Sequence, residues 1–382
     1  MECKKLLDLI DEKFPEYLDF WKDICNIESP SSDKEGVTQV AEYIDAFCRR
    51  KGFKVSRQTY ANAGDTVLVE LPGVETAAPI ALLAHMDTVH QKGAFGEPPV
   101  TQKGDLLYGP GVVDCKGGIA VALLAMEALQ QSGMEHPTLR LILNSDEEDG
   151  TYVGEEGVEF IKDAARGCAA AFNCESGREG LLIVGRKGIF RAKVTVTGKA
   201  AHAGAKYFEG VSAIREAAHK IIALEACSAA DGITMNCGVI QGGTVSNIVP
   251  ESCSFLVDVR FRNDKEEQYA IDCLNDIVGR AYVPGSRSTW EVSKRRPAME
   301  NTPANRALFE MVAKNAVELG LDELTASESG GGSDSAYTVG VGVPTVCTFG
   351  PTGRYIHSVR EEADIRALPD RAKLLAVSIL TV

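Results

Sequence analysis

Histidines and carboxylates stand at the ends of several strand-like segments of this sequence. The segment ALLAHMD ends in His85 and Asp87. The segment LILNSDEEDG passes from an apolar run into four consecutive acids, Asp146 to Asp149. The segment AAAFNCE ends in Glu175. The carboxyl ends of strands in an open parallel sheet meet at one edge, where binding sites form, so we expect these side chains to converge.

Two further residues of the same kinds are expected in loops. Asp114 stands in the glycine-rich stretch GPGVVDCKGG before a predicted helix, and His357 follows a strand in GPTGRYIHS. Each alone has an ordinary explanation, as a packed histidine, a turn acid or a loop residue. Together they could not share one edge without a cation, because like charges repel and burial strengthens the repulsion.

The types of these side chains indicate which cations they would hold. Imidazole and carboxylate ligands suit zinc, with cobalt or manganese possible. Their number suits two ions bridged by one carboxylate, with a hydroxide held between the ions. Cys115, beside Asp114, could supply a thiolate, but we expect it to be structural. The remaining histidines at 90, 136 and 219 are also expected to be structural.

The elements that must position these residues alternate between strands and helices over 1–185. Apolar residues at helical spacing predict helices near 32–52 and 119–133, and TVLVEL and TLRLILN are typical of strands. Strands that alternate with crossover helices indicate a mixed, mostly parallel sheet flanked by helices, and therefore an α/β fold.

The pattern changes after about residue 185. The stretch GIFRAKVTVTG alternates apolar and polar residues, which is typical of a half-exposed antiparallel strand. A β-α-β-β-α-β order follows and predicts an α+β ferredoxin-like domain over 186–294. From 295 the chain returns to α/β character. We therefore expect one α/β domain formed by 1–185 and 295–382, which carries the metal site, and one inserted domain.

Composition excludes several classes of function. The chain has 382 residues and a net charge of −14, so a phosphate backbone would repel it and a nucleic-acid partner is not expected. The sequence contains no apolar run long enough to span a membrane, and its start predicts an amphipathic helix rather than a signal peptide. Eleven cysteines without a C-x-x-C pair favour a cytoplasmic chain with reduced thiols.

A series of motifs resembles a known family of enzymes. In chain order they are HMDTV, GPGVVDCKGG, DEEDG, a glutamate ending the next strand, GKAAHAG, GTVSNIVPE, GGGSDSAY and YIHS. The set is similar to the co-catalytic zinc metallopeptidases, which include carboxypeptidase G, aminoacylase, acetylornithine deacetylase and succinyl-diaminopimelate desuccinylase. The resemblance covers nearly the whole chain and is strongest to the carboxypeptidase G (glutamate carboxypeptidase) branch. It implies a zinc exopeptidase-like fold.

The resemblance implies a set of metal ligands. Asp114 would bridge two zinc ions. His85 and Glu175 would complete the coordination of one ion, and Glu148 and His357 that of the other. The family also has a non-proline cis peptide after its bridging aspartate, which would fall between Asp114 and the next residue.

Two further roles are implied at the same site. Glu147, next to Glu148, matches the general base, and Asp87 matches the residue that orients His85. A base needs a free lone pair near the attacking water, so Glu147 should not itself be a ligand.

In the inserted domain and the late glycine-rich run, the resemblance implies contacts with substrate. His202 matches a residue that stabilises the oxyanion, often in the active site of a partner subunit. The other positions match groups that hold a substrate carboxylate or the oxyanion: Asn247, Arg260, Arg296 and Gly331. The inserted domain is accordingly expected to form a homodimer and to act as a lid.

These observations favour a di-zinc amidohydrolase that cleaves N-acyl or N-aminoacyl amino acids with a free carboxylate. An aminoacylase, deacetylase or dipeptidase would share every catalytic residue and differ only in the substrate pocket. Relatives that act as aminopeptidases usually carry aspartate where Glu175 stands. A glutamate-selective pocket needs another cation, and the sequence offers only Arg178 near the site. A non-catalytic binding protein on the same scaffold would usually lack a ligand or the base, and none is missing here.

Overall fold

The computed structural model describes residues 2–150 and 152–382, which form two compact units. The first unit comprises Met1–Val184, Asn301–Glu328 and Ser333–Val382. The second comprises Gly185–Glu300 together with Ser329–Gly332. The second unit thus extends beyond the 186–294 range expected from sequence, because Met299 exchanges backbone hydrogen bonds with Arg186 and Lys187 donates to the Ser329 carbonyl oxygen.

The first unit contains a mixed sheet in which the inner strands are parallel and the outer strands antiparallel. Strand β3 pairs in parallel with β6 and β7, and β7 pairs in parallel with β16. Strands β1 and β2 add to one side in antiparallel fashion, and β8 pairs antiparallel with β16. The strands, in sheet order, are β1 Lys54–Gln58, β2 Thr66–Leu71, β6 Leu139–Asn144, β3 Ile80–His85, β7 Ala170–Asn173, β16 Thr345–Cys347, β8 Leu181–Arg186 and β15 Thr325–Ser329.

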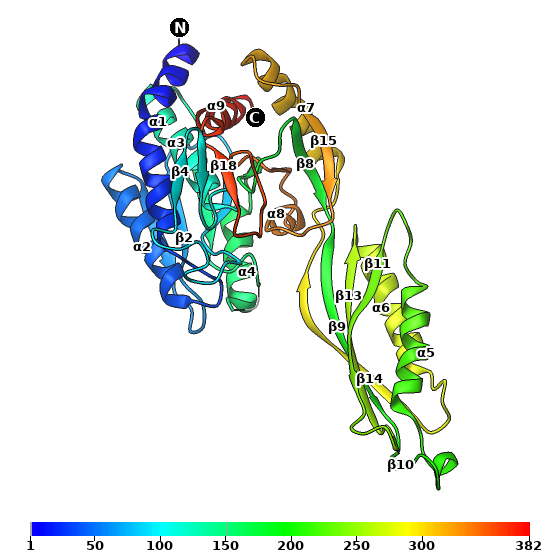
Figure 1. Ribbon diagram of the computed structural model, residues 1–382. Coiled ribbons are helices and arrows are strands. Elements are labelled where there is room, and N and C mark those ends of the chain that lie inside the picture. Colours follow the sequence, from blue (N-terminus) through cyan, green and yellow to red (C-terminus); the bar gives the residue numbers. More distant parts are fainter. Residues whose placement is uncertain (1, 151) are drawn as a thin grey trace. The chain divides into compact units, whose positions relative to one another are not determined.

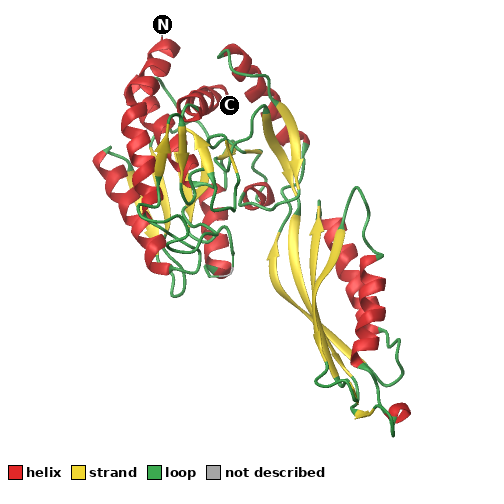
Figure 2. Cartoon of the chain, in the orientation of Figure 1, coloured by secondary structure: helices red, strands yellow, loops and turns green. Residues whose placement is uncertain are grey.

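Helices cover both faces of this sheet, as the sequence predicted (Figure 2). Strand residues alternate between the two faces: Leu82 packs in the cluster with α3, and Leu83 packs in the other cluster with α4. The helices are α1 Glu2–Asn26, α2 Lys34–Arg50, α3 Lys116–Ser132, α4 Gly154–Ala165, α7 Pro303–Glu318, α8 Ser335–Gly340 and α9 Ala367–Thr381.

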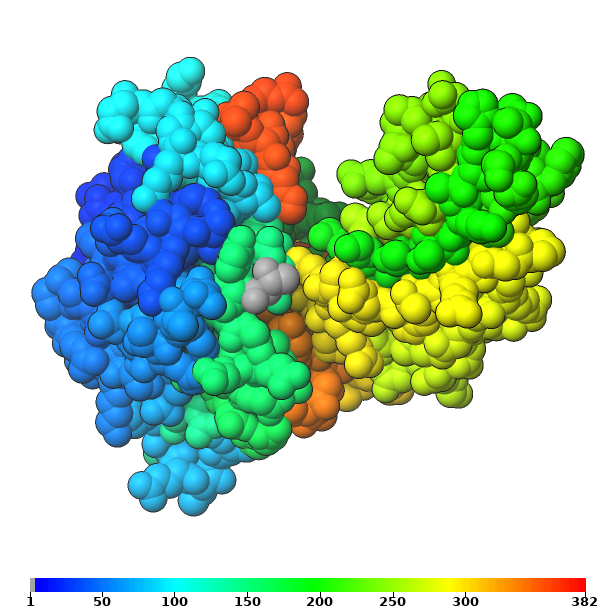
Figure 3. Space-filling model, turned by 90° about the horizontal axis from the view of Figure 1, so that it is seen from below, coloured from blue at the N-terminus to red at the C-terminus, as the bar shows by residue number. Residues whose placement is uncertain are grey.

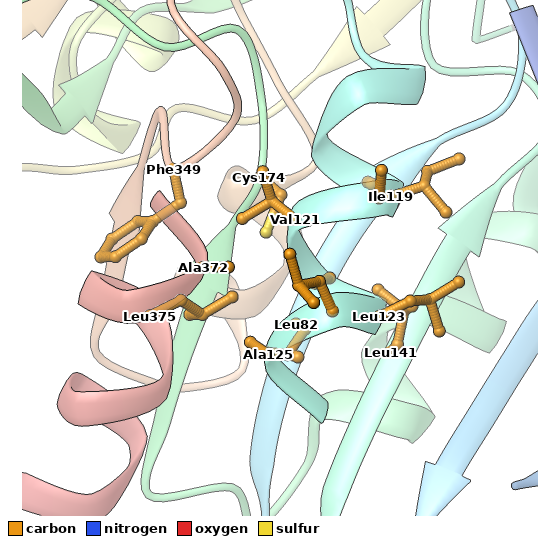
Figure 4. Packing of buried hydrophobic residues seen from close by; sticks show 14 of the residues in the cluster. Leu82, Ile119, Val121, Leu123, Ala125, Leu141, Cys174, Phe349, Ala372 and Leu375 are labelled. Carbon is orange, nitrogen blue, oxygen red and sulfur yellow. The ribbon is translucent and has the colours of Figure 1, made fainter. Parts of the chain in front are cut away.

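Helix α3 is the centre of the core. Its residues are buried from Lys116 to Leu129, so it is enclosed on every side rather than along one stripe. In Figure 4, Leu123 and Ala125 of this helix lie against Leu82 and Leu141 of the sheet. This packing fixes the loop that precedes α3, which contains Asp114.

A small antiparallel sheet holds the segment that contains His357. Its strands are β17 Gly353–Arg354, β18 Glu362–Asp364, β5 Leu106–Tyr108 and β4 Thr101–Lys103. Strand β18 pairs with β5, so the late chain is joined to the part of the chain that leads to Asp114. Figure 3 shows the orange-red surface of this late segment beside the cyan surface of the earlier one.

The second unit has the predicted ferredoxin-like order (Figure 1). Its antiparallel sheet has the order β11-β13-β9-β14, and the buried positions of β9 alternate as the sequence pattern indicated. Helices α5 and α6 cover one face. The elements are β9 Gly188–Thr197, α5 Ala213–Glu225, β11 Thr234–Gly242, β13 Ser252–Phe261, α6 Asp264–Gly279 and β14 Arg287–Arg296, with short segments β10 Ala201–His202, η1 Tyr207–Glu209 and β12 Ile248–Val249. None of the helices in the described ranges combines the length and the apolar composition of a membrane span.

Candidate metal centre

Three neighbouring parallel strands end at one edge of the larger sheet and deliver the side chains that the sequence singled out. His85 is the last residue of β3 and is the strand partner of Asn144, the last residue of β6. The acids after β6 therefore begin beside His85. Strand β7 ends on the other side of β3, and Glu175 follows it by two residues. The register of the sheet thus places the ends of these strands together.

Five side chains form two groups that share Asp114. His85, Asp114 and Glu175 offer ligand atoms that all lie within 4.8 Å of one another, as do Asp114, Glu148 and His357. One Asp114 oxygen lies 3.2 Å from His85 Nε2, and the other lies 3.2 Å from His357 Nε2. His357 Nε2 is also 3.3 Å from Glu148 Oε2. The donor set fits two divalent cations bridged by one carboxylate.

The backbone around Asp114 allows this close approach. The Asp114–Cys115 peptide is cis, as the resemblance implied. The second and third residues of α3 are glycines, and a Cβ on Gly118 would lie 1.8 Å from the carbonyl oxygen of Cys174. Only glycine lets the start of α3 come this near the segment that leads to Glu175. Cys115 itself is buried, which raises the pKa of its thiol, and its sulfur accepts from the His85 backbone N–H at 3.1 Å.

Asp87 joins His85 to the acidic segment. His85 Nδ1 lies 3.0 Å from the Asp87 carbonyl oxygen and 3.3 Å from its Oδ1. The Asp87 carboxylate accepts the backbone N–H groups of Glu147 and Glu148, at 3.0 and 3.1 Å, and the Ser31 hydroxyl at 2.6 Å. Burial opposes ionisation of Asp87, but the hydrogen bonds from His85 and Ser31 lower its pKa. With Nδ1 occupied in this way, His85 Nε2 faces Asp114 and Glu175.

The four-acid run divides into residues with different environments. Asp146 accepts backbone N–H groups from Gly150 and Val153, each at 3.0 Å, and so forms the turn itself. Burial raises the pKa of Asp146 to about 6. Glu147 is buried, and Glu148 belongs to one of the two groups that could hold a metal ion. A cavity of about 300 Å³ lies beside Glu148 and Asp149. The run is therefore more than a solvated turn.

The profile of the peptidase family M20/M25/M40 matches residues 81–381. This chain belongs to that family. Carboxypeptidase G2 of Pseudomonas sp. (strain RS-16) is 30% identical over 364 residues, which cover 94% of this chain and 87% of that protein. The M20 chain is therefore a hydrolase of the metallo-carboxypeptidase and amidohydrolase kind.

Solved structures share the fold of this M20 hydrolase. The aminopeptidase PepT of Bacillus cereus superposes with a TM-score of 0.81 at 21% identity, covering 96% of this chain and 98% of that one. The Bacillus subtilis YXEP protein, described as a dinuclear metal binding peptidase, superposes with a TM-score of 0.72 at 17% identity, covering 97% and 99%. These similarities show that the M20 chain shares its fold with both solved structures.

One residue that sequence reasoning missed supports the loop before α3. Glu361 is fully buried and accepts the backbone N–H groups of Val113 and Asp114, at 2.8 and 3.0 Å. Its second oxygen lies 2.8 Å from His90 Nε2 and 3.3 Å from the Gly111 N–H. The sequence did offer one indication of Glu361, because this acid follows His357 by four residues in the same loop. His90 keeps the structural role expected of it.

We expect Glu361→Gln to destabilise the loop before α3 without removing any of the five grouped side chains. An amide keeps only one acceptor oxygen, so at least one buried N–H group loses its partner, which costs about 1–3 kcal/mol. Thermal and denaturant unfolding of the metal-free protein measure this loss. Glu97→Gln, at an exposed loop acid, is the matched control. Equal stability of the two variants would contradict the assigned role.

The structure brings three of the expected substrate-binding positions together at one end of the second unit. Arg260 on β13 and Arg296 on β14 are both strand partners of Ile189 on β9. Arg260 Nη1 lies 3.4 Å from the Gly330 carbonyl oxygen. Gly331 therefore stands in the same neighbourhood as the two arginines.

The other two positions lie together beyond the opposite end of β9. Strand β10, which ends in His202, pairs with β12, and the N–H of residue 203 donates to the Asn247 carbonyl oxygen at 2.9 Å. His202 is exposed, and its Nδ1 accepts the backbone N–H groups of residues 204 and 205 at 3.2 and 3.1 Å. The ring proton is therefore carried by Nε2, which can act as a donor.

Proposed function

We propose that this M20 hydrolase is a two-metal amidohydrolase that acts on N-acyl or N-aminoacyl amino acids with a free carboxylate. The observation that carries the proposal is the pair of three-residue groups that share Asp114. His85 and Glu175 would hold one ion with Asp114, and Glu148 and His357 would hold the other. Zinc fits the mixture of imidazole and carboxylate donors, with cobalt or manganese as alternatives. A metal pair of this kind supplies Lewis acidity for amide hydrolysis.

Glu147 is the proposed proton carrier. Its backbone N–H and that of Glu148 both donate to the Asp87 carboxylate, which holds in place the backbone that carries the two side chains. Glu148 would be a metal ligand, and Glu147, which is in neither group of candidate ligands, would carry the proton. In the reaction Glu147 would take a proton from the attacking water and pass it to the nitrogen of the departing amine. Bond cleavage then releases the amino acid and the acyl or aminoacyl acid.

Metal content and turnover test the proposed activity together. We expect about two divalent ions per chain, and chelator-sensitive hydrolysis of one class in a panel of N-acetyl, N-benzoyl and dipeptide forms of Glu, Phe, Leu and Arg. Activity should return when the chelated protein is reloaded with zinc. A protein that binds no metal, or that hydrolyses the panel equally well in excess chelator, would contradict the proposal. The panel also separates carboxypeptidase-like from deacylase or dipeptidase specificity.

A homodimer formed through the second unit is part of the proposal. Within this unit, Arg260 and Arg296 flank Ile189, whereas His202 lies beyond Thr197. Thr197 stands eight positions after Ile189 along the strand, or about 26 Å at roughly 3.3 Å per residue. One small substrate cannot reach both ends. His202 can therefore assist at a site that uses the two arginines only if another subunit supplies it.

Mixing two inactive variants tests this arrangement. His202→Ala and Glu147→Gln should each be inactive alone. When the two variants are coexpressed, half of the dimers should contain one chain of each. Each mixed dimer regains one complete site, so activity should recover to roughly a quarter of the native value. A mixture that stays inactive, although mixed dimers are isolated, would place His202 in its own subunit's site or outside the reaction.

A further inference from the structure

A second cavity lies in the first unit, walled by residues outside the two metal-ligating groups. Its volume is about 410 Å³, which is within the range of about 300–1,000 Å³ typical of small-molecule sites. Leu321 and Leu324 lie between α7 and β15, and Leu374 on α9 completes an apolar wall. A neighbouring cavity of similar size shares four lining residues with it. Together they make a hollow with one apolar side.

Arg371 gives this cavity a buried positive charge. Arg371 is only 7% exposed, and its Nη2 donates to the Arg178 carbonyl oxygen at 2.8 Å. The other terminal nitrogen, Nη1, is buried without a hydrogen-bond partner in the described part of the chain. Burial lowers the pKa of Arg371 to about 10. A buried N–H group without an acceptor is costly, and a carboxylate matches the guanidinium well.

Acidic residues complement this arginine. Asp322 and Asp370 line the same cavity, are exposed to solvent, and make no ion pair with any described residue. They stand beside the apolar wall, where their carboxylates could bind a cationic group of a ligand. The cavity therefore combines a guanidinium that can bind an anion, carboxylates that can bind a cation, and an apolar surface. Its dimensions are those of a small molecule.

We propose that this cavity binds a free α-amino acid with an apolar side chain. The ligand carboxylate would pair with Arg371, its ammonium group with Asp322 and Asp370 together, and its side chain would pack against the three leucines. This site goes beyond the proposed hydrolytic activity and does not depend on it. A free amino acid is nevertheless the class of product that the proposed reaction releases, so the site would report product accumulation.

The walls of the cavity continue into the two metal-ligating groups. Arg178, whose carbonyl oxygen accepts from Arg371, follows Glu175 by three residues. On the other side, Thr352 and Asp364 line the cavity, and the backbone N–H of Asp364 donates to the Thr352 carbonyl oxygen at 2.9 Å. The chain between them carries His357. A ligand that orders both walls should therefore favour metal binding, and by linkage metal should favour the ligand equally.

Calorimetric titration of the chelator-treated full-length protein tests binding. Without metal, the ligand carboxylate cannot bind at the proposed metal site instead of the cavity. The probes are L-leucine, 4-methylpentanoate, which lacks the amine, and 3-methylbutylamine, which lacks the carboxylate. We expect L-leucine to bind with a Kd near or below about 1 mM and each fragment to bind at least about tenfold more weakly. No saturable binding of L-leucine, or equal binding of the fragments, would overturn the proposal.

Variants locate the site. Arg371→Leu should abolish L-leucine binding, and Asp370→Asn, at an exposed position, should weaken it by about tenfold. Arg306→Leu, at an exposed arginine of α7, is the matched control and should bind as the native protein does. If Arg371→Leu does not fold, as shown by its thermal melt, the Asp370→Asn result decides. Native affinity in a folded Arg371→Leu or in Asp370→Asn would place the ligand elsewhere.

The coupling is tested by metal affinity rather than by activity. Zinc titrations of the native protein should show several-fold tighter binding in saturating L-leucine, with a smaller change in Asp370→Asn. Identical zinc affinity with and without bound L-leucine would overturn the coupling. Failure of hydrolysis in the substrate panel would leave both titrations interpretable, because neither requires turnover.

Discussion

Glu147→Gln should reduce kcat by about 10²–10⁴-fold while the protein keeps its full metal content. The amide has nearly the shape of the carboxylate but cannot take a proton from water. The backbone N–H of residue 147 still donates to Asp87, so the neighbouring Glu148 keeps its position. Steady-state kinetics on the best panel substrate, with metal analysis of the same sample, measures both quantities.

A control separates loss of the base from a general change of charge. Glu155→Gln removes one exposed carboxylate at the start of α4 and should leave kcat unchanged. Loss of metal from Glu147→Gln would make this residue a ligand instead of a base. Unreduced turnover with metal retained would remove Glu147 from the reaction.

Asp114→Asn should weaken both proposed metal sites at once. The two oxygens of Asp114 face different histidines, and an amide offers only one neutral oxygen in their place. Loss of even an outer partner of a metal ligand costs about 10–100-fold in metal affinity, so loss of the shared ligand should cost more than about 100-fold. Metal content after dialysis should fall from two ions toward none, and hydrolysis should fall with it.

Comparison with single-site variants makes this prediction specific. His357→Ala touches one group only and should leave one tightly held ion, whereas Asp8→Asn, at an exposed acid of α1, should leave two. Retention of one ion by Asp114→Asn, as in His357→Ala, would show that the carboxylate serves a single ion. The shared-ligand arrangement would then be wrong.

The sequence predicted the parts of the site that follow regular elements. His85 and Glu175 come directly after apolar runs of strand length, and the parallel order of those strands puts their ends at one edge. Asp114 and His357 lie in loops, so periodicity alone could not place them. The family resemblance was needed to assign them to the same groups.

The side chains that support the site through contacts with loops could not be predicted from the sequence. Glu361 and Ser31 support the site through hydrogen bonds that depend on the tertiary path of two loops, and no spacing in the sequence encodes that path. The same is true of Ser329–Gly332, which belong to the second unit although they lie far along the chain from the rest of it. The ferredoxin-like order was predictable because buried and more exposed residues alternate along β9 and β13, and because α5 and α6 each have an apolar stripe.

The two groups of proposed metal ligands differ in how deeply they are buried, and this has a kinetic consequence. The side chain of His85 is 1% exposed and that of His357 is 54% exposed. The buried group adjoins α3, which can open only when the core of the first unit opens. We therefore expect two bound ions to have unequal lifetimes. The ion at Glu148 and His357 would exchange with the solution quickly, and the ion at His85 and Glu175 would be trapped for far longer. A brief soak in a second metal would then yield a protein carrying two different ions.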